Sequence, residues 1–374
     1  MKEDASCSSD KSCCGQASAK VSPKPCCPPP HWQLKSILTP AGLVPRARTD
    51  LQFADRLGTL KARLGISRIR YSVRPGLYAV GNPTKDSPVL VSANHKMSFD
   101  HLRSSMNGTD AWIMVLDTKG INVWCAAGKG TFGTDEIVNR ISTTNLDKVV
   151  AHRALILPQL GAPGVAAHKV KARSGFRVVY GPVRAQDLPA FLDAGMKAAP
   201  EMRRIKFTFR DRLVLVPMEL VIGPKYLAVL LAALFFLGGM GREGYSLHNA
   251  TIAGSAAVAL TVLGFLAGAA VAPMLLPWLP GRAFSIKGAV VGLVPAIAYA
   301  AYRIPGPEGT ARVLEIVPWF LILPALAAFF AMNFTGASTY TSLSGVKKEM
   351  RFALPAEIAA ALLGIGLWIA GRFV

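Results

Sequence analysis

The sequence predicts an α/β domain followed by an all-α transmembrane bundle of about five spans, and two observations support that division. Short apolar runs alternate with helical patterns between Tyr78 and Ala199, as is typical of an α/β sheet. After residue 224 the chain consists mainly of long apolar segments, and only 10 of its 42 Lys and Arg lie there. The two halves therefore belong to different classes of structure.

We divide the chain into four parts. Residues 1–30 are a Cys/Pro-rich tail that is too poor in apolar residues to fold and lacks the apolar stretch of a signal peptide. Residues 31–74 are a basic linker with an amphipathic helix from Leu51 to Leu64. Residues 75–224 form the α/β domain, and residues 225–374 form the transmembrane domain.

Four apolar runs in the α/β domain are expected to be strands, and three helical patterns separate or follow them. The strands are Val89–Ala93, Ala111–Leu116, Ala154–Leu157 and Phe176–Tyr180, and the helices are Asp135–Arg140, Val165–Lys171 and Asp187–Ala199. Each run ends in polar or turn-forming residues. Because ligands of open α/β sheets bind beyond the carboxyl ends of the strands, we expect these loops to form one site.

Five apolar segments in the C-terminal half are candidate spans, and since the first and third are close to the lower limit of about 20 residues, four or six spans are the alternatives. They are Tyr226–Met240, Ala250–Leu276, Ile286–Tyr302, Val313–Phe334 and Leu354–Ile369. Basic residues before the first span and in alternate loops place the α/β domain on the cytoplasmic side of the inner membrane. Few charges interrupt the segments, which favours a packed anchor over an ion pathway, and we expect Glu315 and Glu357 to make hydrogen bonds.

The charge and the cysteines limit the possible partners. The net charge is +20, but the basic residues are scattered and no nucleic-acid motif accompanies them, so we expect no nucleic-acid partner. Attraction to an anionic leaflet or an acidic partner fits better. Cysteine is confined to the tail except at Cys125, which argues against a disulfide scaffold, and no C-x-x-C pair suggests an iron–sulfur cluster.

Cys125 is the main candidate for chemistry. It follows Trp124, lies among small residues, and leads into glycines at 128, 130 and 133. A helix that starts in this segment would stabilise a thiolate, which is a nucleophile and a metal ligand. Two alternatives remain: an inert core cysteine, or a dinucleotide loop in which Gly128–Gly133 fits G-x-G-x-x-G and Asp147 is the following acid.

Four stretches carry a specific resemblance. Asp117–Lys129 (DTKGINVWCAAGK) resembles the cap-helix motif of the HgcA family of mercury-methylating membrane corrinoid proteins. Ser92–Asp100, Leu157–Gly164 and Tyr180–Ala185 are similar to the same family's domain, which in turn resembles the corrinoid domain of the corrinoid iron–sulfur protein. The resemblance implies a Rossmann-like corrinoid-binding domain that holds a base-off corrinoid of the cobalamin type.

The resemblance also implies roles for individual residues. Cys125 would be the lower axial ligand to cobalt and the catalytic residue, because a thiolate is a soft anionic donor. Trp124 would either cover the corrin edge or anchor the segment in the core, and Thr134 would either bind the cofactor or cap the next helix. The full set expected to bind the cofactor is Asn122, Val123, Trp124, Cys125, Ala126, Gly128, Lys129, Gly130, Thr131, Gly133, Thr134, Gln159, Gly161 and Gly181.

The function implied is transfer of a methyl group from cobalt to Hg(II), which forms methylmercury. The implied partners are a ferredoxin-like [4Fe-4S] protein as electron donor and a methyl donor such as a methylated folate. The tail pairs Cys13–Cys14 and Cys26–Cys27 are candidates for Hg(II) delivery, although an unfolded tail offers no fixed site. Two other functions stay open: a corrinoid methyl carrier of one-carbon metabolism, and a membrane transporter or receptor with a nucleotide-binding domain.

Overall fold

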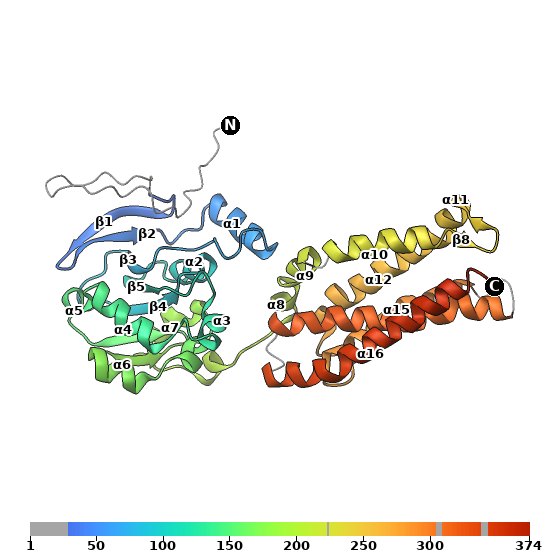
Figure 1. Ribbon diagram of the computed structural model, residues 1–374. Coiled ribbons are helices and arrows are strands. Elements are labelled where there is room, and N and C mark those ends of the chain that lie inside the picture. Colours follow the sequence, from blue (N-terminus) through green and yellow to red (C-terminus); the bar gives the residue numbers. More distant parts are fainter. Residues whose placement is uncertain (1–28, 223, 304–308, 338–342) are drawn as a thin grey trace. The chain divides into compact units, whose positions relative to one another are not determined.

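The computed structural model describes residues 29–222, 224–303, 309–337 and 343–374 (Figure 1). The chain separates into two compact units. The first, the sheet unit, runs to Gly58 and continues from Ile69 to Arg204, and the second, the helical unit, combines Thr59–Arg68 with Ile205–Val374. The cysteines of the N-terminal tail lie outside the described residues.

The sheet unit is built on one mixed sheet of seven strands in the order β1-β2-β3-β5-β4-β6-β7. The strands are β1 (Gln33–Thr39), β2 (Gly42–Ala47), β3 (Gly76–Val80), β4 (Val89–Ala93), β5 (Ala111–Leu116), β6 (Ala154–Leu157) and β7 (Arg177–Tyr180). Strands β4, β5, β6 and β7 are parallel to one another, so their carboxyl ends lie at one edge of the sheet.

Helices cover both faces of this sheet. They are α2 (Lys96–Ser105), α3 (Val123–Gly128), α4 (Thr134–Thr143), α5 (Leu146–Val149), α6 (Ala167–Ser174) and α7 (Leu188–Asp193), and the chain also forms α1 (Phe53–Arg63) before β3. Successive residues of a strand point to opposite faces of the sheet, so the sheet unit has two hydrophobic cores, one on each face. Val89 and Val91 pack with residues of α3, α4 and α6, while Leu90 and Ile113 pack with residues of α2 and α7.

The four expected strands are present, with β7 beginning one residue late, but two expectations need correction. The segment 31–74, expected to be a linker, contributes the antiparallel hairpin β1–β2, and β2 pairs in parallel with β3. The helix expected over Asp187–Ala199 ends at Asp193, because Gly195 and Met196 adopt left-handed backbone conformations with φ of 65° and 62°. The amphipathic helix expected from Leu51 to Leu64 is α1.

The helical unit contains a small two-stranded hairpin and nine α-helical elements among the described residues. They are α8 (Phe209–Leu213), α9 (Val216–Ile222), α10 (Pro224–Leu237), β8 (Met240–Gly241), β9 (Gly244–Tyr245), α11 (Leu247–Asn249), α12 (Ser255–Leu266), α13 (Ala272–Leu275), α14 (Phe284–Arg303), α15 (Thr310–Asn333) and α16 (Leu343–Ala370). Elements α11 to α13 are continuous through two wider turns and form one helix, Leu247–Leu275.

Four helices of the described chain are long and apolar enough to cross a membrane, not five. They are Leu247–Leu275, Phe284–Arg303, Thr310–Gly336 and Ser344–Ala370. The first expected span lies in α10, within which Leu227–Leu237 is the apolar part. The 14 residues of α10 extend roughly 21 Å, less than the hydrocarbon core of about 30 Å, and the helix ends before Gly238 and Gly239.

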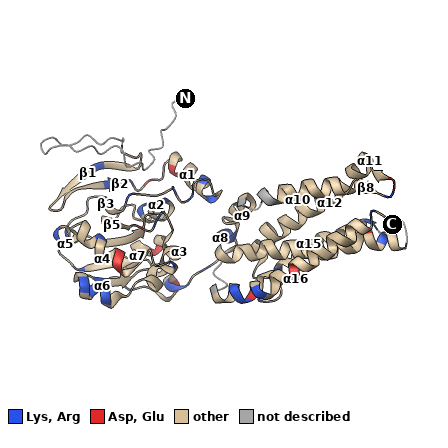
Figure 2. Cartoon of the chain, in the orientation of Figure 1, with Lys and Arg blue, Asp and Glu red and all other residues tan. Residues whose placement is uncertain are grey.

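Close glycine contacts hold the long helices together. A Cβ atom added at Gly268 or Gly288 would lie 2.4 or 2.5 Å from the carbonyl oxygen of Ala327, so only glycine allows these helices to approach so closely. Glu315 of α15 forms an ion pair with Arg303 and accepts a hydrogen bond of 3.3 Å from the Tyr299 hydroxyl. Figure 2 shows little other charge along α12 and α15. The hydrogen bond expected of Glu315 is thus present, whereas Glu357 has no hydrogen-bond partner within the described chain, contrary to the expectation.

Candidate functional site

Cys125 lies in the first turn of the six-residue helix α3, at the carboxyl edge of the parallel strands. The side chain of Asn122 caps this helix, since its Oδ1 accepts a hydrogen bond of 2.9 Å from the Cys125 backbone N. The thiol is free and half-buried. The helix start expected in this segment is therefore present, and Asn122 has the expected capping contact.

The two sides of α3 differ in exposure. Val123, Ala126 and Ala127 face the core, where Ala126 and Ala127 are buried. With 3.6 residues per turn, Trp124, Cys125 and Gly128 fall within one sector of about 100° on the opposite side. Trp124 is 38% exposed, which argues against its role as a core anchor and leaves its indole able to cover a ligand.

The loop before α3 is fixed by one buried side chain at the end of β4. Asn94 Oδ1 accepts hydrogen bonds from the backbone N of Gly120 at 2.9 Å and of Thr118 at 3.2 Å. Gly120 has a φ of 73°, and a Cβ there would lie 2.2 Å from the Ile69 carbonyl oxygen. The hydrogen bond from Lys119 Nζ to Asp117, 2.8 Å long, keeps the pKa of that carboxyl below its usual range. Asn94, which follows β4, thus holds the loop that follows β5 and leads into α3.

Backbone hydrogen bonds turn the chain back toward α3 after the helix ends. The Ala126 carbonyl oxygen accepts from Thr131 N at 3.0 Å and Phe132 N at 3.1 Å, and the Phe132 ring is fully buried. A Cβ at Gly161 would lie 2.6 Å from that ring, and one at Gly164 would lie 2.2 Å from the Phe132 carbonyl oxygen. The stretch Leu157–Gly164 therefore forms the support on which α3 rests.

The glycines expected to admit a cofactor separate into two groups. An added Cβ at Gly128 or Gly130 would meet nothing within 4 Å, so both positions leave their backbone open to a ligand. Gly133, Gly161 and Gly181 are packed against protein, at 2.8, 2.6 and 3.1 Å from the nearest atom. A side chain at any of these three positions would crowd the neighbouring protein atoms, and their expected contact with a cofactor stays a prediction.

The remaining polar residues of the expected set have protein partners or lie exposed. Thr134 is the first residue of α4 and not its cap, and its hydroxyl accepts from Ala166 N at 2.9 Å. Gln159 accepts a hydrogen bond of 2.8 Å from Arg203. The Thr131 hydroxyl lies 3.4 Å from the Ala126 carbonyl oxygen, and Lys129 is exposed beyond the end of α3. The Thr134 hydroxyl and the Gln159 amide act only as acceptors in these contacts, so each can still donate a hydrogen bond to a ligand.

A cavity of about 500 Å³ adjoins the glycine segment. It is lined by Gly130, Gly133, Thr134, Asp135, Pro163, Gly164, Val165, Ala166, Lys169 and Arg173. The dinucleotide interpretation required the glycines to follow a strand, but Gly128 is the last residue of α3. The local structure therefore lacks the strand-to-glycine turn of a dinucleotide fingerprint.

A buried charge cluster was not foreseen from the sequence, although Lys96 and Asp100 lie in one of the stretches singled out. Lys96 Nζ lies 2.8 Å from Asp55 Oδ1 and 2.7 Å from Asp100 Oδ2, and Arg103 also contacts both acids. Burial alone would raise the pKa of Asp55, but the hydrogen bond and charge of Lys96 hold it well below its usual range. The helical spacing of Lys96, Asp100 and Arg103 was the available signal, and the distant Asp55 had none.

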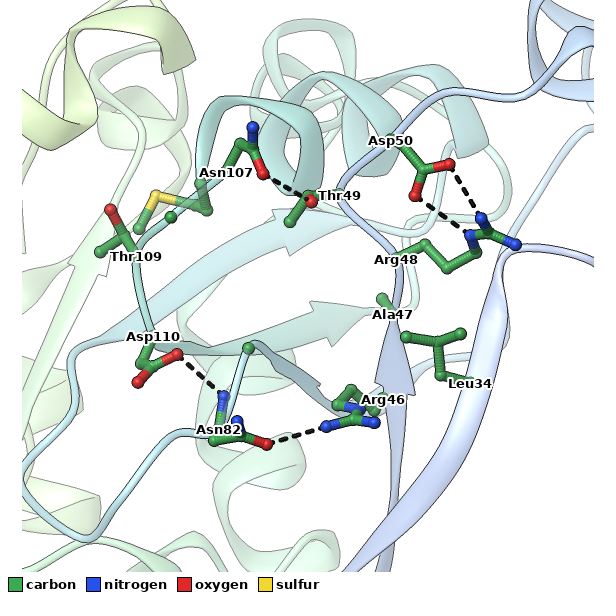
Figure 3. Close-up of a pocket in the computed structure, with 13 residues that line it drawn as sticks. Leu34, Arg46, Ala47, Arg48, Thr49, Asp50, Asn82, Asn107, Thr109 and Asp110 are labelled. Carbon is green, nitrogen blue, oxygen red and sulfur yellow. Dashed lines mark hydrogen bonds and ion pairs between the residues drawn. The ribbon is translucent and has the colours of Figure 1, made fainter.

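A larger cavity, of about 590 Å³, lies at the opposite edge of the sheet from Cys125 (Figure 3). There Arg46 donates a hydrogen bond of 2.8 Å to Asn82, and Asp110 accepts one of 2.8 Å from Asn82 N. No expected site residue lines it. Among the described residues no group of three or more His, Cys, Asp or Glu side chains could hold a metal ion, so Cys125 is a single donor.

Comparison with known proteins locates the similarity in the sheet unit. Residues 65–192 match the family model of the CO dehydrogenase/acetyl-CoA synthase delta subunit. The acetyl-CoA decarbonylase/synthase complex subunit gamma of Methanopyrus kandleri is 31% identical over 123 residues, which are 32% of this chain and 26% of the relative. The subunit gamma of Archaeoglobus fulgidus is 28% identical over 128 residues, or 34% and 27% of the two chains.

The matched stretch contains every expected site residue and ends before Ile205, where the main segment of the helical unit begins. The chain spans about a quarter of the length of these curated relatives. The similarity thus concerns a corresponding domain and leaves the long helices without a counterpart in the matched region.

Proposed function

We propose that the chain is a membrane-anchored, corrinoid-dependent methyltransferase of the HgcA type, which transfers a methyl group to Hg(II). The similarity to subunits of the acetyl-CoA decarbonylase/synthase complex supports a role in methyl transfer, since the corresponding resemblance from the sequence is to a corrinoid domain. The observation that carries the proposal is the free Cys125 thiol on the open side of α3.

The residues present suit a large flat ligand with a metal at its centre. Cys125 offers one soft donor, Trp124 offers an exposed indole beside it, and Gly128 and Gly130 leave the backbone unobstructed. On the opposite side of α3, Ala126 and Ala127 pack into the hydrophobic core, which fixes the position of the helix. When bound, the corrinoid supplies a cobalt–carbon bond whose methyl group is transferred.

The chain's own contribution is to position a thiolate. Asn122 and the turn held by Asn94 fix the start of α3, so Cys125 is presented by a helix whose first turn is capped. If a corrinoid is bound, the Cys125 thiolate would be the residue that holds its cobalt, and the electron density that a thiolate donates would suit transfer of a methyl group to an electrophile. Hg(II) is such an electrophile, and this is why a cysteine at position 125 favours Hg(II) over a nucleophilic acceptor.

The test starts from the full-length chain in lipid nanodiscs, reconstituted with cobalamin without oxygen. We expect a visible corrinoid spectrum and a sulfur neighbour of cobalt in X-ray absorption, both lost in Cys125→Ala. Methylmercury formation should fall more than about 100-fold in that variant, because loss of a ligand should exceed the 10–100-fold effect of losing its supporting contacts. Ser142→Ala, at an exposed position of α4, is the matched control and should behave as the wild type.

A corrinoid methyl carrier of one-carbon metabolism is the second candidate, favoured by the names of the relatives. It shares the cofactor and Cys125 and differs in the acceptor. Hg(II) and a thiol acceptor offered in parallel separate the two: faster methylation of the thiol would establish the carrier and overturn mercury methylation. In either case a ferredoxin-like [4Fe-4S] protein is the proposed electron donor, and a methylated folate the proposed methyl donor.

The long apolar helices support a location in the cytoplasmic membrane, with the sheet unit on the cytoplasmic side. This side is the one on which a soluble electron donor is available. Protease accessibility of the sheet unit in inverted and right-side-out vesicles tests the orientation, and cleavage only in right-side-out vesicles would contradict it.

A further inference from the structure

The helical unit contains a cavity of about 240 Å³ between α10, α12, α15 and α16, four helices that run alongside one another (Figure 1). Its walls are apolar, with Leu230, Leu234, Ile322 and Phe329 among the lining residues. Only two lining side chains carry polar atoms, Thr261 of α12 and Glu357 of α16. Neither residue has a role in the function proposed above.

Both polar side chains are buried and have no hydrogen-bond partner within the described chain. Glu357 is 8% exposed and both of its carboxyl oxygens lack a partner, and the same is true of the hydroxyl of Thr261, which is 0% exposed. Burying such groups without partners is costly, and an acid inside a membrane helix normally has a functional partner. Glu315, by contrast, is paired with Arg303.

Thr261 and Glu357 both lie in the apolar part of the helical unit. Thr261 is midway along the helix Leu247–Leu275, and Glu357 follows the charged residues Lys347, Lys348 and Arg351 of α16 by six to ten residues. Because every other lining side chain is apolar, a ligand of this cavity must have a polar head that is stable in apolar surroundings.

The cavity's size and opening restrict the ligand further. A single water molecule occupies about 30 Å³, so the space admits a ring but not a complete drug-sized molecule. Two lining residues, Phe329 and Ile358, are 40% and 52% exposed, which places an opening on the apolar surface of the helices. A ligand with an apolar tail can thus insert its head and leave the tail among the lipids.

The charge of the ligand follows from the lack of further polar groups. A cation would require an ionised Glu357, and a buried ion pair is stable only when additional hydrogen bonds complete it. The lining offers only Thr261 for that purpose. A neutral carboxyl and a hydroxyl, in contrast, can each donate and accept one hydrogen bond with an uncharged oxygen-bearing head.

We propose that Thr261 and Glu357 bind the head of an uncharged, lipid-soluble molecule of the quinone or quinol class within the helical unit. The carboxyl and the hydroxyl hydrogen-bond the ring oxygens, and the apolar walls contact the ring faces. The proposal concerns binding and does not depend on the corrinoid function.

The experiment uses the full chain in nanodiscs and follows labelling of Glu357 by dicyclohexylcarbodiimide with mass spectrometry, because this reagent modifies protonated carboxyls in apolar surroundings. We expect Glu357 to be labelled and decylbenzoquinone to slow the labelling at least about fivefold, which corresponds to about 1 kcal/mol of stabilisation of the occupied state. Decylamine is the cationic probe of the same tail length and should slow it less.

Two variants sharpen the result. Thr261→Val keeps the shape of the side chain and should reduce the protection by the quinone, while Leu326→Met, a change at another lining position, should preserve it. Protection by decylamine that equals or exceeds that by decylbenzoquinone, or no protection by either, overturns the proposal. Dimers whose cross-linked interface includes Glu357 would also overturn it, because a second copy would then cover the cavity.

Discussion

In the sheet unit, the buried carboxylates of Asp55 and Asp100 are surrounded by Lys96 and Arg103, whereas in the helical unit the buried carboxyl of Glu357 faces apolar side chains and the Thr261 hydroxyl. Ion pairs and hydrogen bonds surround the first pair of acids, since Arg103 contacts both carboxylates and also donates to the Arg48 carbonyl oxygen at 2.6 Å. The Glu357 carboxyl has no partner in the described chain. The comparison teaches that buried charged groups which pair with one another stabilise a fold. Buried polar groups without a partner, such as Glu357 and Thr261, instead indicate a missing ligand.

The completed network joins distant parts of the sequence. Asp55 comes from α1 and the other three charged residues from α2, and Trp32 places its ring 5.4 Å from Lys96 Nζ. The cluster therefore fixes the N-terminal hairpin region to the sheet. Its members would be expected to affect stability strongly and ligand binding at Cys125 only indirectly.

The largest expected effect is that of Lys96→Met. This change leaves Asp55 and Asp100 buried with one fewer cation, and the free energy of unfolding should fall by about 3–5 kcal/mol. Urea denaturation of the full chain followed by circular dichroism measures it. The control is Arg173→Met, which breaks the exposed ion pair with Asp135 and should cost less than about 1 kcal/mol. Equal losses in both variants would show that the buried cluster does not hold the fold.

The second effect separates the two groups of glycines around Cys125. In Gly164→Ala the new Cβ meets the Phe132 carbonyl oxygen at 2.2 Å, and overpacking of this kind should cost about 1–3 kcal/mol. Gly128→Ala meets nothing within 4 Å, so the apoprotein should keep its melting temperature while its affinity for cobalamin falls. Thermal melting and cobalamin titration distinguish them, and equal destabilisation by the two changes would contradict the division.

The third prediction concerns acid. Because the folded-state pKa of Asp55 is lowered below its ordinary value of 3.8, the ionised carboxylate stabilises the folded chain at all pH values above about 4. That stabilisation is lost as the pH falls through the lowered pKa of the folded state. Asp55→Asn should remove this part of the pH dependence in melting curves recorded between pH 6 and pH 2, and an unchanged slope would exclude Asp55 as its source.

The smallest effect is expected from neutral replacements of the two acids in the long helices. Glu357→Gln should change the melting temperature little or raise it, because no ion pair is broken. Glu315→Gln removes the partner of Arg303 and should cost about 1 kcal/mol. A thermal-shift comparison in nanodiscs tests the pair, and a greater loss for Glu357→Gln would mean that this carboxyl has a structural partner.

Much of the fold could be predicted from local patterns. The apolar runs at 89–93, 111–116 and 154–157 became β4, β5 and β6 with the expected limits, because a buried strand is an uninterrupted apolar run. The hairpin Gln33–Ala47 was not recognised, since its exposed and basic residues resemble a linker. The prediction of the first span was wrong because hydropathy reports only the composition of a segment. The length of the helix depends on where it ends, and α10 ends before Gly238 and Gly239.

The site, like the strands, was predictable in part because some of its features are local sequence patterns. A single cysteine beside small residues and a capping asparagine is a local pattern, and α3 begins where that pattern places it. The different roles of Gly128 and Gly161 depend on Phe132 and on the neighbouring loop, so their spacing in the sequence held no information about them.

The sequence by itself determined the division into two halves, the parallel strands and the position of Cys125 at a helix start, because hydrophobic periodicity and capping act between residues close in the chain. Only the tertiary structure decided which glycines are open, that Asp55 joins Lys96, and that Thr261 and Glu357 share one cavity. These features bring together residues 29 positions apart (Phe132 and Gly161), 41 apart (Asp55 and Lys96) and 96 apart (Thr261 and Glu357), and the packing of whole elements decides which distant residues become neighbours.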